Sequence, residues 1–396
     1  MFKDKLAEIL NYFEPVQLRD FEDSFFLNNE SSVGNWLLIN GVGQTLQASS
    51  KFELAIIFVD AYVNPSNDHS THTTQLIREE LYKLQKVSSG FRIADLGNLK
   101  TGKNFNDTLF TLREVCTLLF SLKVNVIVVG GSQLLTLGTF RGFKEFENNI
   151  NLIHIDSRID LSANENEIDE THYLNQIVQH EASYIYNISC VGYQTYFVDN
   201  KQIKQLNELY FEHYRLGDVK ASFEQIEPVI RDGDLVSFDI SAVRMSDAPA
   251  QSNGSPNGFF ADEACRIARY AGISDRVQAF GLYEIDSKYD RNKETIKLAA
   301  QIIWYYLEGY INRKHDFPQA SLNDCTKYDV QIDEIDFPIV FYRSNKSGRW
   351  WLEVKTVQNQ NNDDESVIVS CTEQDYLKAC KNEIPDRWWI NFKKLK

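Results

Sequence analysis

The sequence predicts an α/β protein with a central, mostly parallel sheet that is covered by helices on both faces, followed by a small C-terminal α+β appendage. Between residues 51 and 318, short apolar runs alternate with longer stretches of helical periodicity. Runs that are apolar almost throughout are typical of strands buried on both faces, which is where parallel sheets occur. The pattern changes after residue 318, and this change separates the appendage from the sheet domain.

Residues 1–50 are expected to form a helical extension in front of the sheet domain. Phe2, Leu6, Ile9 and Phe13 fall on one face of a helix. The first eight residues carry two lysines and two acids, and no continuous apolar segment follows them, so a signal peptide is not expected. No run of 18 apolar residues occurs in the chain, and no transmembrane span is expected either.

The sheet domain is assigned to residues 51–318, and its elements follow from apolar periodicity. Strands are expected over residues 53–60, 91–98, 124–131, 151–156, 183–192, 234–241 and 277–286. Helices are expected over residues 72–86, 107–122, 200–215, 260–271 and 292–313. Binding sites in such sheets form at the carboxyl ends of the strands, so polar residues just past these runs are the candidates for function.

Residues 319–396 are read as a tryptophan-rich appendage that packs on the surface of the sheet domain. A hairpin is expected over 337–357, turning near Asn345–Gly348, and a helix over 373–382. Four of the six tryptophans lie in this part of the chain. They suit the core of a small unit that needs large side chains. A partner-binding face is the alternative, because tryptophan is a favoured interface anchor.

The 396 residues carry a net charge of −15, which argues against nucleic acid or an anionic membrane as a partner. The six cysteines are scattered without a CxxC pair. Free thiols in the reducing cytoplasm are therefore expected.

Polar residues follow the apolar runs in three places: "VVGGSQLLTLG" (128–138), "HIDSRID" (154–160) and "LVSFDISAVRMSDAP" (235–249). In the second of these, Asp156 and Asp160 flank Arg158. Two carboxylates at this spacing suit a hard divalent cation. A guanidinium does not, because it stays protonated and ligates nothing.

Together with "GLYEIDSKYDRNKETIKLAAQIIW" (281–304), the order and spacing of these segments resemble the ureohydrolase family, which comprises arginase, agmatinase and formimidoylglutamase. The resemblance covers roughly residues 50–313. It implies a three-layer arginase-like fold. It also implies four aspartates and two histidines that hold two manganese ions, whose bridging hydroxide attacks a guanidino or formimidoyl carbon.

The departures from the family motifs fall on these ligands. Gln133 stands at the first-motif histidine, Arg158 at the second-motif histidine, and Ser241 at an aspartate of the third motif. Arg244 begins the pair that replaces the Asp-Pro ending of that motif. Three of the six implied ligands remain, namely Asp156, Asp160 and Asp239.

The remaining ligands differ between the two metal positions. The second position would keep only Asp156 and Asp239, facing a guanidinium, and is expected to be empty. The first would keep Asp156, Asp160 and Asp239, with the Gln133 amide oxygen as a further ligand. A single Mg²⁺ or Ca²⁺ at that position is the alternative to a site without any metal.

The converging carboxylates need compensation, because two unit charges about 4 Å apart interact by roughly 4 kcal/mol at an effective dielectric of 20. We expect Arg158 to replace the metal and Arg244 to supply a second positive charge. A displaced alignment, with Arg158 directed into solvent, is the alternative. The resemblance implies that Glu284 matches the family acid that binds a cationic group of the substrate. His172 lies where the family places a catalytic or substrate-contacting polar residue.

These observations favour a ureohydrolase-fold pseudoenzyme that is cytoplasmic, holds no metal cofactor and acts by binding a small molecule or a protein. A metal-dependent hydrolase of linear amidines, similar to formimidoylglutamase, is the alternative. A structural subunit anchored by the tryptophan-rich appendage is a third hypothesis. Family members commonly form trimers or hexamers, so a homo-oligomer is possible, altered by the added terminal segments.

Overall fold

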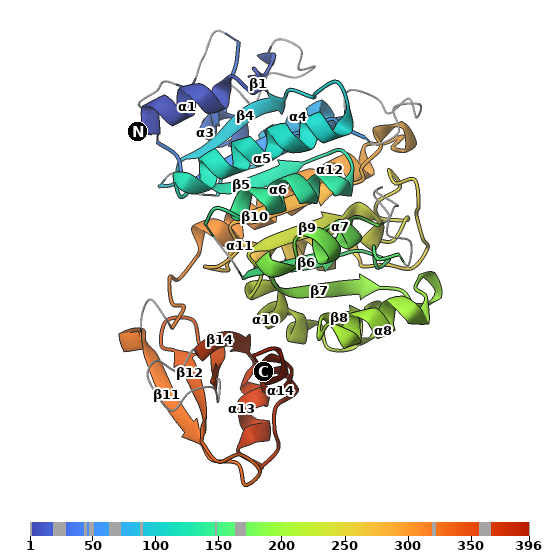
Figure 1. The fold of residues 1–396 in the computed structure, drawn as a ribbon. Coiled ribbons are helices and arrows are strands. Elements are labelled where there is room, and N and C mark those ends of the chain that lie inside the picture. The colour runs from blue at the N-terminus through green and yellow to red at the C-terminus, as the bar shows by residue number, and fades with distance from the viewer. Residues whose placement is uncertain are drawn as a thin grey trace.

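A computed structural model describes residues 2–18, 29–42, 46, 51–62, 73–87, 90–146, 149–162, 172–318, 322–355 and 366–395. Within these ranges one large sheet runs through the molecule in the strand order β1-β4-β3-β5-β10-β9-β6-β7-β8 (Figure 1). A further strand, β2 (Leu38–Ile39), lies beside β4. Every pair of neighbours in this sheet is parallel except β1 with β4.

All seven strands that were expected between residues 53 and 286 form, and the prediction of a mostly parallel sheet is confirmed. The strands of the sheet are β1 (Phe13–Glu14), β3 (Leu54–Phe58), β4 (Ile93–Leu99), β5 (Asn125–Val129), β6 (Ile150–Ile155), β7 (Ile185–Tyr193), β8 (Glu212–Arg215), β9 (Leu235–Asp239) and β10 (Ala279–Tyr283). Every residue of β3, β6, β9 and β10 is buried, which accounts for their continuous apolar runs.

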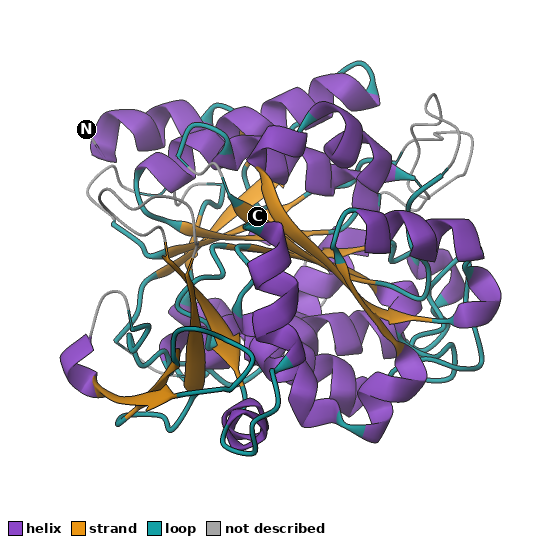
Figure 2. Cartoon of the chain, turned by 60° about the horizontal axis from the view of Figure 1, so that its bottom comes forward, coloured by secondary structure: helices purple, strands orange, loops and turns teal. Residues whose placement is uncertain are grey.

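Helices cover both faces of the sheet, which gives the three layers seen in Figure 2. Ile56 and Phe58 point into one core, whereas Ala55 and Ile57 point into the other, as the period of two along a strand requires. The first core is closed by α3 (Val33–Trp36), α4 (Thr73–Lys83), α9 (Leu216–Ala221), α10 (Ile226–Arg231), α11 (Ala261–Gly272) and α12 (Glu294–Ile311). The second is closed by α1 (Phe2–Leu10), α5 (Phe105–Ser121), α6 (Thr136–Phe143), α7 (Tyr173–His180) and α8 (Asn200–Glu208).

The structure differs from the predicted elements where apolar periodicity is weak. The single helix expected over 200–215 is wrong, because α8 ends at Glu208 and β8 follows it as an edge strand. An edge strand pairs on one side only, and β8 has no buried residue. Helix α6 was not predicted, because seven of its eight residues are buried and such a helix has no polar face. The N-terminal segment, expected to be helical, also adds β1 and β2 to the sheet.

The C-terminal unit is a four-stranded antiparallel sheet with two helices. It consists of β11 (Cys325–Val330), β12 (Ile339–Ser344), β13 (Trp350–Lys355), β14 (Ser366–Cys371), α13 (Glu373–Ala379) and α14 (Asp386–Lys394). The hairpin between β12 and β13 turns where it was expected. Trp350, Trp351 and Trp388 are buried, whereas Trp389 is 42% exposed. Three of the four tryptophans therefore serve as core.

The C-terminal unit packs on the sheet domain through the end of α10. The Arg231 guanidinium donates to the backbone oxygens of Trp350 (3.1 Å) and Cys371 (3.5 Å), and it lies 4.4 Å from the ring centre of Trp351. The neighbouring Asp232 carboxylate accepts the Ser370 amide at 2.8 Å. Buried polar contacts of this kind fix the orientation of the two units.

None of the described helices has both the length and the apolar character that a membrane crossing requires. All six cysteines are free thiols, and four of them are buried.

Replacement of Arg231 by alanine is expected to lower the free energy of unfolding by about 2 kcal/mol, because it leaves buried carbonyl oxygens without their charged donor. Urea denaturation measures the loss, and limited proteolysis near residues 313–324 reports loosening of the C-terminal unit. Arg215→Ala is the matched control. Arg215 is 54% exposed and pairs with Asp218, so its loss should leave the free energy of unfolding close to that of the wild type. Equal losses in the two variants would contradict the role given to Arg231.

Candidate functional site

Acidic side chains meet at the carboxyl ends of three neighbouring strands. Asp156 directly follows β6, Asp239 is the last residue of β9, and Glu284 directly follows β10. These residues lie around a cavity of about 30 Å³. The cavity, called the strand-end pocket, is lined by Asp156, Arg158, Asp160, Asp239, Ser241, Gln251, Ser252, Asn253 and Glu284. Its volume suits an ion or a water molecule rather than an amino acid.

The glycine pair after β5 brings Gln133 and Glu284 together. Gly131 has a φ of 71°, and a Cβ atom there would lie 2.5 Å from the backbone oxygen of Ala61, so only glycine fits. After this turn, the backbone amide of Gln133 donates to Glu284 Oε1 at 2.5 Å. Glu284 has a φ of 63°, which is uncommon for a residue with a side chain and is held by a hydrogen bond from its amide to Gly131 O. Such backbone strain is often found at functional sites.

Gln133 is fully buried and bridges two carboxylates. In one orientation of its amide, Nε2 donates to Asp160 Oδ2 (3.1 Å) and to Asp156 Oδ2 (3.2 Å), while Oε1 accepts from Ser237 Oγ (3.1 Å). This orientation satisfies both ends of the amide. The opposite orientation would bring three oxygens together, an arrangement that suits a cation. In the satisfied orientation, the protein supplies a neutral donor between two carboxylates.

The other oxygen of Asp156, Oδ1, also accepts hydrogen bonds from groups of the protein. Asp156 Oδ1 accepts the backbone amide of Arg158 (2.9 Å) and the hydroxyls of Ser157 and Ser241 (both 3.3 Å). The Ser241 amide donates to Asp239 Oδ1 at 2.6 Å. Ser241, which stands where the resemblance implies an aspartate, therefore acts as a hydrogen-bond donor to Asp156 and Asp239.

The prediction that the Arg158 guanidinium neutralises the carboxylates is wrong. This group lies 4.3 Å from the ring centre of Phe197 and, within the described part of the chain, pairs with none of Asp156, Asp160 and Asp239. The backbone amide of Arg158 is the group that faces Asp156, and the side chain is directed to the aromatic ring. Arg158 still lines the strand-end pocket.

Three predicted residues do not line the strand-end pocket, namely Gln133, which lies behind Asp156 and Asp160, and Arg244 and His172. Arg244 pairs with Asp247 at 2.8 Å and lies over the ring of Phe260, so the prediction that it supplies charge to the carboxylates is also wrong. A short 3-10 helix (Ile240–Ala242) separates Arg244 from the end of β9. His172 precedes α7 and is partly buried outside the pocket lining.

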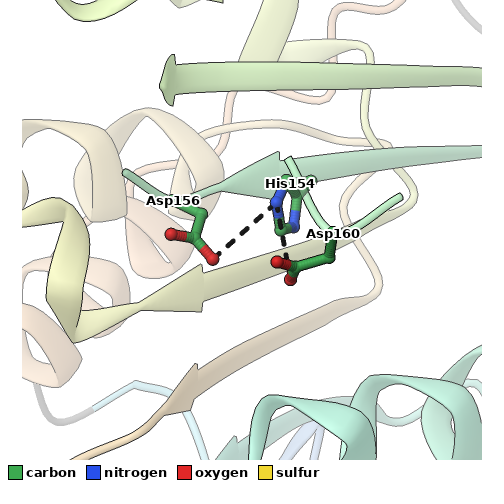
Figure 3. Close-up of side chains that lie close together, drawn as sticks. All are labelled: His154, Asp156 and Asp160. Atoms are coloured by element: carbon green, nitrogen blue, oxygen red, sulfur yellow. Dashed lines mark ion pairs between the residues drawn. The ribbon is translucent and has the colours of Figure 1, made fainter. Parts of the chain in front are cut away.

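His154 belongs to the site although the sequence analysis did not select it. It lies two residues before Asp156 in β6, and therefore on the same face of the strand. Its Nε2 atom is 3.8 Å from Asp156 Oδ2 and 3.8 Å from Asp160 Oδ2 (Figure 3). Burial lowers the pKa of His154 in spite of Asp156, which favours the neutral ring at neutral pH. The period of two along the strand was the signal that could have identified it.

Gln251 was also missed. It lines the strand-end pocket and is buried, and its Oε1 atom has no hydrogen-bond partner among the described residues. Its Nε2 atom donates to the backbone oxygens of Val243 and Ala248. The orphaned oxygen is a vacant acceptor at the pocket.

The charge of Asp239 is poorly compensated. Burial raises the pKa of Asp239 well above its ordinary value, and the nearby Asp156 and Glu284 carboxylates raise it further. A carboxyl group whose pKa is raised by folding makes the folded state less stable as the pH rises from the ordinary value through the raised one.

Asp239→Asn is therefore expected to increase the free energy of unfolding at pH 8, by about 1.4 kcal/mol for each unit by which folding raises the pKa. The gain should shrink at pH 5, where the wild-type carboxyl takes up a proton more readily. Urea denaturation at both pH values measures this, with the exposed Asp218→Asn as the control. A loss of stability at pH 8 would mean that the Asp239 carboxylate has a positive partner.

Arg158→Ala is expected to cost about 1 kcal/mol or less, because the guanidinium contributes a contact with an aromatic ring. Loss of a counter-charge to buried carboxylates would cost roughly 3–5 kcal/mol instead. A double-mutant cycle with Phe197→Leu measures the contact, and the combined loss should be smaller than the sum of the single losses. Additive losses would exclude the contact with Phe197 as the main role of Arg158.

Comparisons with known proteins identify the family and the fold. The sequence model of the Arginase family matches residues 63–308. The formimidoylglutamase of Staphylococcus haemolyticus (strain JCSC1435) is 22% identical over 303 residues, which is 74% of this chain and 94% of that protein. The crystal structure of Trypanosoma cruzi formiminoglutamase with Mn²⁺ aligns with a TM-score of 0.60 at 16% identity, over 67% of this chain and 97% of that one.

Two structures from Bacillus subtilis subsp. subtilis str. 168 are also similar. Its formimidoylglutamase aligns with a TM-score of 0.59 at 16% identity, over 67% of this chain and 89% of that one. Its arginase aligns with a TM-score of 0.55 at 17% identity, over 67% of this chain and 99% of that one. At these identities the structural matches establish the three-layer fold.

Proposed function

Since this chain belongs to the arginase family, we propose that it is a member that acts by binding, with hydrogen-bond donors of the protein in place of a dinuclear metal centre. The observation that carries the proposal is the set of contacts around Asp156. Amide and hydroxyl groups reach one oxygen of this carboxylate, and the Gln133 amide reaches the other. A carboxylate satisfied in this way does not require a cation.

The residues present do not fit a pair of manganese ions. The second position has only Asp156 and Asp239 as carboxylate ligands, and Ser241 offers a neutral hydroxyl in place of a third. Arg158, which also lines the pocket, cannot ligate a metal. Two dications would therefore lack both ligands and compensating charge, and the two-metal reaction has no basis in this ligand set.

The binding proposal extends to the class of ligand. Asp239 and Glu284 give the strand-end pocket an acidic wall, and Gln251 adds an unpartnered acceptor oxygen. A group with N–H donors and a positive charge complements such a wall. We infer an ammonium or amidinium head group, carried by a small molecule or by a side chain of a protein partner.

A single-metal hydrolase of linear amidines is the second candidate. It is favoured by His154, Asp156 and Asp160, whose potential ligand atoms lie within 4.8 Å of one another. It is also favoured by the similarity to formimidoylglutamases. When bound, a divalent ion would supply Lewis-acid chemistry, and the Gln133 amide would then present its oxygen to that ion.

The two candidates predict different metal contents. After dialysis against manganese and then against buffer, the wild-type protein is expected to retain well under one equivalent per chain. The triple variant Gln133→His, Arg158→His, Ser241→Asp restores the implied ligands and is expected to bind manganese stoichiometrically. Arg158→His alone should not, because Ser241 would still lack a carboxylate. Elemental analysis measures the metal content, and circular dichroism verifies that each variant is folded.

Activity provides the second measurement. We expect no release of product from formimidoylglutamate or a guanidino substrate by the wild-type protein in the presence of manganese. One or more equivalents of manganese bound to the wild-type protein, together with turnover of either substrate, would establish the hydrolase in place of the binding protein.

A further inference from the structure

Strand β11 forms one edge of the C-terminal sheet, whose strand order is β11-β12-β13-β14. It pairs with β12 along all six of its residues, and within the described part of the chain no strand pairs with its other side. Strand β14 lies at the opposite edge and contacts α10, so β11 faces away from the sheet domain (Figure 1). An edge strand of this length is a template on which a further strand can pair.

We propose that β11 pairs with β11 of a second copy of this chain. The two strands run antiparallel about a two-fold axis at Tyr328, so that the two C-terminal sheets join into one. The direction of the backbone groups and the order of the charges both point to this partner.

The backbone groups that point outward follow from the pairing inside the sheet. The Ser344 amide of β12 donates to the Arg349 backbone oxygen, so Ser344 faces β13. Backbone direction alternates along a strand, so the neighbouring Arg343 faces β11, where its register partner is Thr326. The same alternation along β11 gives the residues whose amides and carbonyls point away from β12, namely Cys325, Lys327 and Asp329.

These outward groups match those of a second copy. The outward amides and carbonyls of Lys327 and Asp329 have no hydrogen-bond partner among the described residues. With the axis at Tyr328, Lys327 stands directly opposite the partner's Asp329. Both residues point their backbone groups at the shared edge, so each such pair exchanges two hydrogen bonds as in an ordinary antiparallel ladder.

The side-chain charges are self-complementary in the same register. Lys327 and Asp329 project from one face of the strand, are 54% and 53% exposed, and have their charged atoms 3.1 Å apart. Lys327 faces the partner's Asp329, and symmetry makes Asp329 face the partner's Lys327. The four charges then alternate in sign around the axis. Opposite charges at directly paired positions stabilise a sheet.

Tyr328 lies on the axis and on the other face of the strand. Its ring centre is 5.3 Å from that of Trp350 and 5.2 Å from that of Tyr376, which fixes it against the core of the C-terminal unit. In the proposed register it stands opposite the partner's Tyr328 in a non-hydrogen-bonded pair, where side chains approach most closely. An aromatic pair at this position adds apolar contact.

A lysine in an edge strand is also a common device against edge pairing. It acts because an approaching strand meets a charge that it cannot match. The order Lys-Tyr-Asp at 327–329 removes that penalty for an antiparallel second copy. A parallel, in-register copy would place each charge beside its own kind, so the charges also select the direction of the pairing.

Sedimentation velocity of the full chain tests the association. A single strand pair is a small interface, so we expect monomer at low micromolar concentration and a monomer–dimer equilibrium at high micromolar concentration. Absence of any dimer at the high concentration would overturn the proposal.

Charge variants test the register. Lys327→Asp and Asp329→Lys each place like charges opposite each other twice, and each is expected to weaken self-association at least tenfold. Mixed in equal amounts, the two variants restore both ion pairs and are expected to form a heterodimer as strong as the wild-type dimer. Recovery on mixing also excludes a fold defect in either variant. Lys204→Asp, which removes an exposed ion pair on α8, is the matched control and should dimerise as the wild type does.

Hydrogen exchange identifies the surface. The amides of Lys327 and Asp329 are expected to be protected at high concentration only, whereas those of Thr326 and Tyr328, which face β12, should be protected at every concentration. A wild-type dimer that leaves the Lys327 and Asp329 amides unprotected would overturn the proposal. An oligomer that both charge variants retain unchanged would overturn it as well.

Discussion

Buried carboxylates must be compensated, and the arrangement at the ends of β6, β9 and β10 follows from that constraint. A parallel sheet brings the ends of its neighbouring strands to one edge, so Asp156, Asp239 and Glu284 are forced close together. Metal ions are one source of compensation in such a site. Backbone amides, serine hydroxyls and the Gln133 amide are another, and this chain presents them at hydrogen-bonding distance. Burial and the nearby Asp156 and Glu284 carboxylates raise the pKa of Asp239, and the neutral donors of Ser241 lower it too little to offset them.

The same constraint connects the replaced residues to one another. Without the Gln133 side-chain amide, Asp156 Oδ2 and Asp160 Oδ2 would lose the donor that lies between them. Ser241 supplies another donor to Asp156. Because hydrogen-bond donors already contact the carboxylates, no guanidinium is required between them, and that of Arg158 packs on Phe197. Gln133, Ser241 and the backbone of Arg158 therefore act as one hydrogen-bond network around Asp156.

Periodicity in the sequence was sufficient to predict the parallel sheet and to place Asp156 and Asp239 at its edge, because alternation and strand ends are local properties. It did not predict the direction of Arg158, since a side chain past the end of a strand follows the loop and its neighbours. Phe197 is distant in sequence from Arg158, and no residue near position 158 predicts the contact between them. His154 and Gln251 were not predicted, because the spacing of the motifs points only to the expected ligand positions and these two residues lie at other positions.

The C-terminal unit adds a second place where charge is buried, at the other edge of the same sheet. Its contacts with the end of α10 use Arg231 and Asp232, adjacent residues of opposite charge. Arg231 donates to backbone carbonyl oxygens of the unit, and Asp232 accepts from the backbone amide of Ser370. Burial raises the pKa of Asp232, although the positive charge of Arg276, which pairs with Asp234, opposes this shift. Buried carboxylates therefore need compensation at both edges of the sheet. At the strand-end pocket the compensation comes from hydrogen bonds with the protein's own residues, whereas at the other edge Arg276 pairs with Asp234, and Lys394 and Arg387 outweigh the burial that would raise the pKa of Glu212.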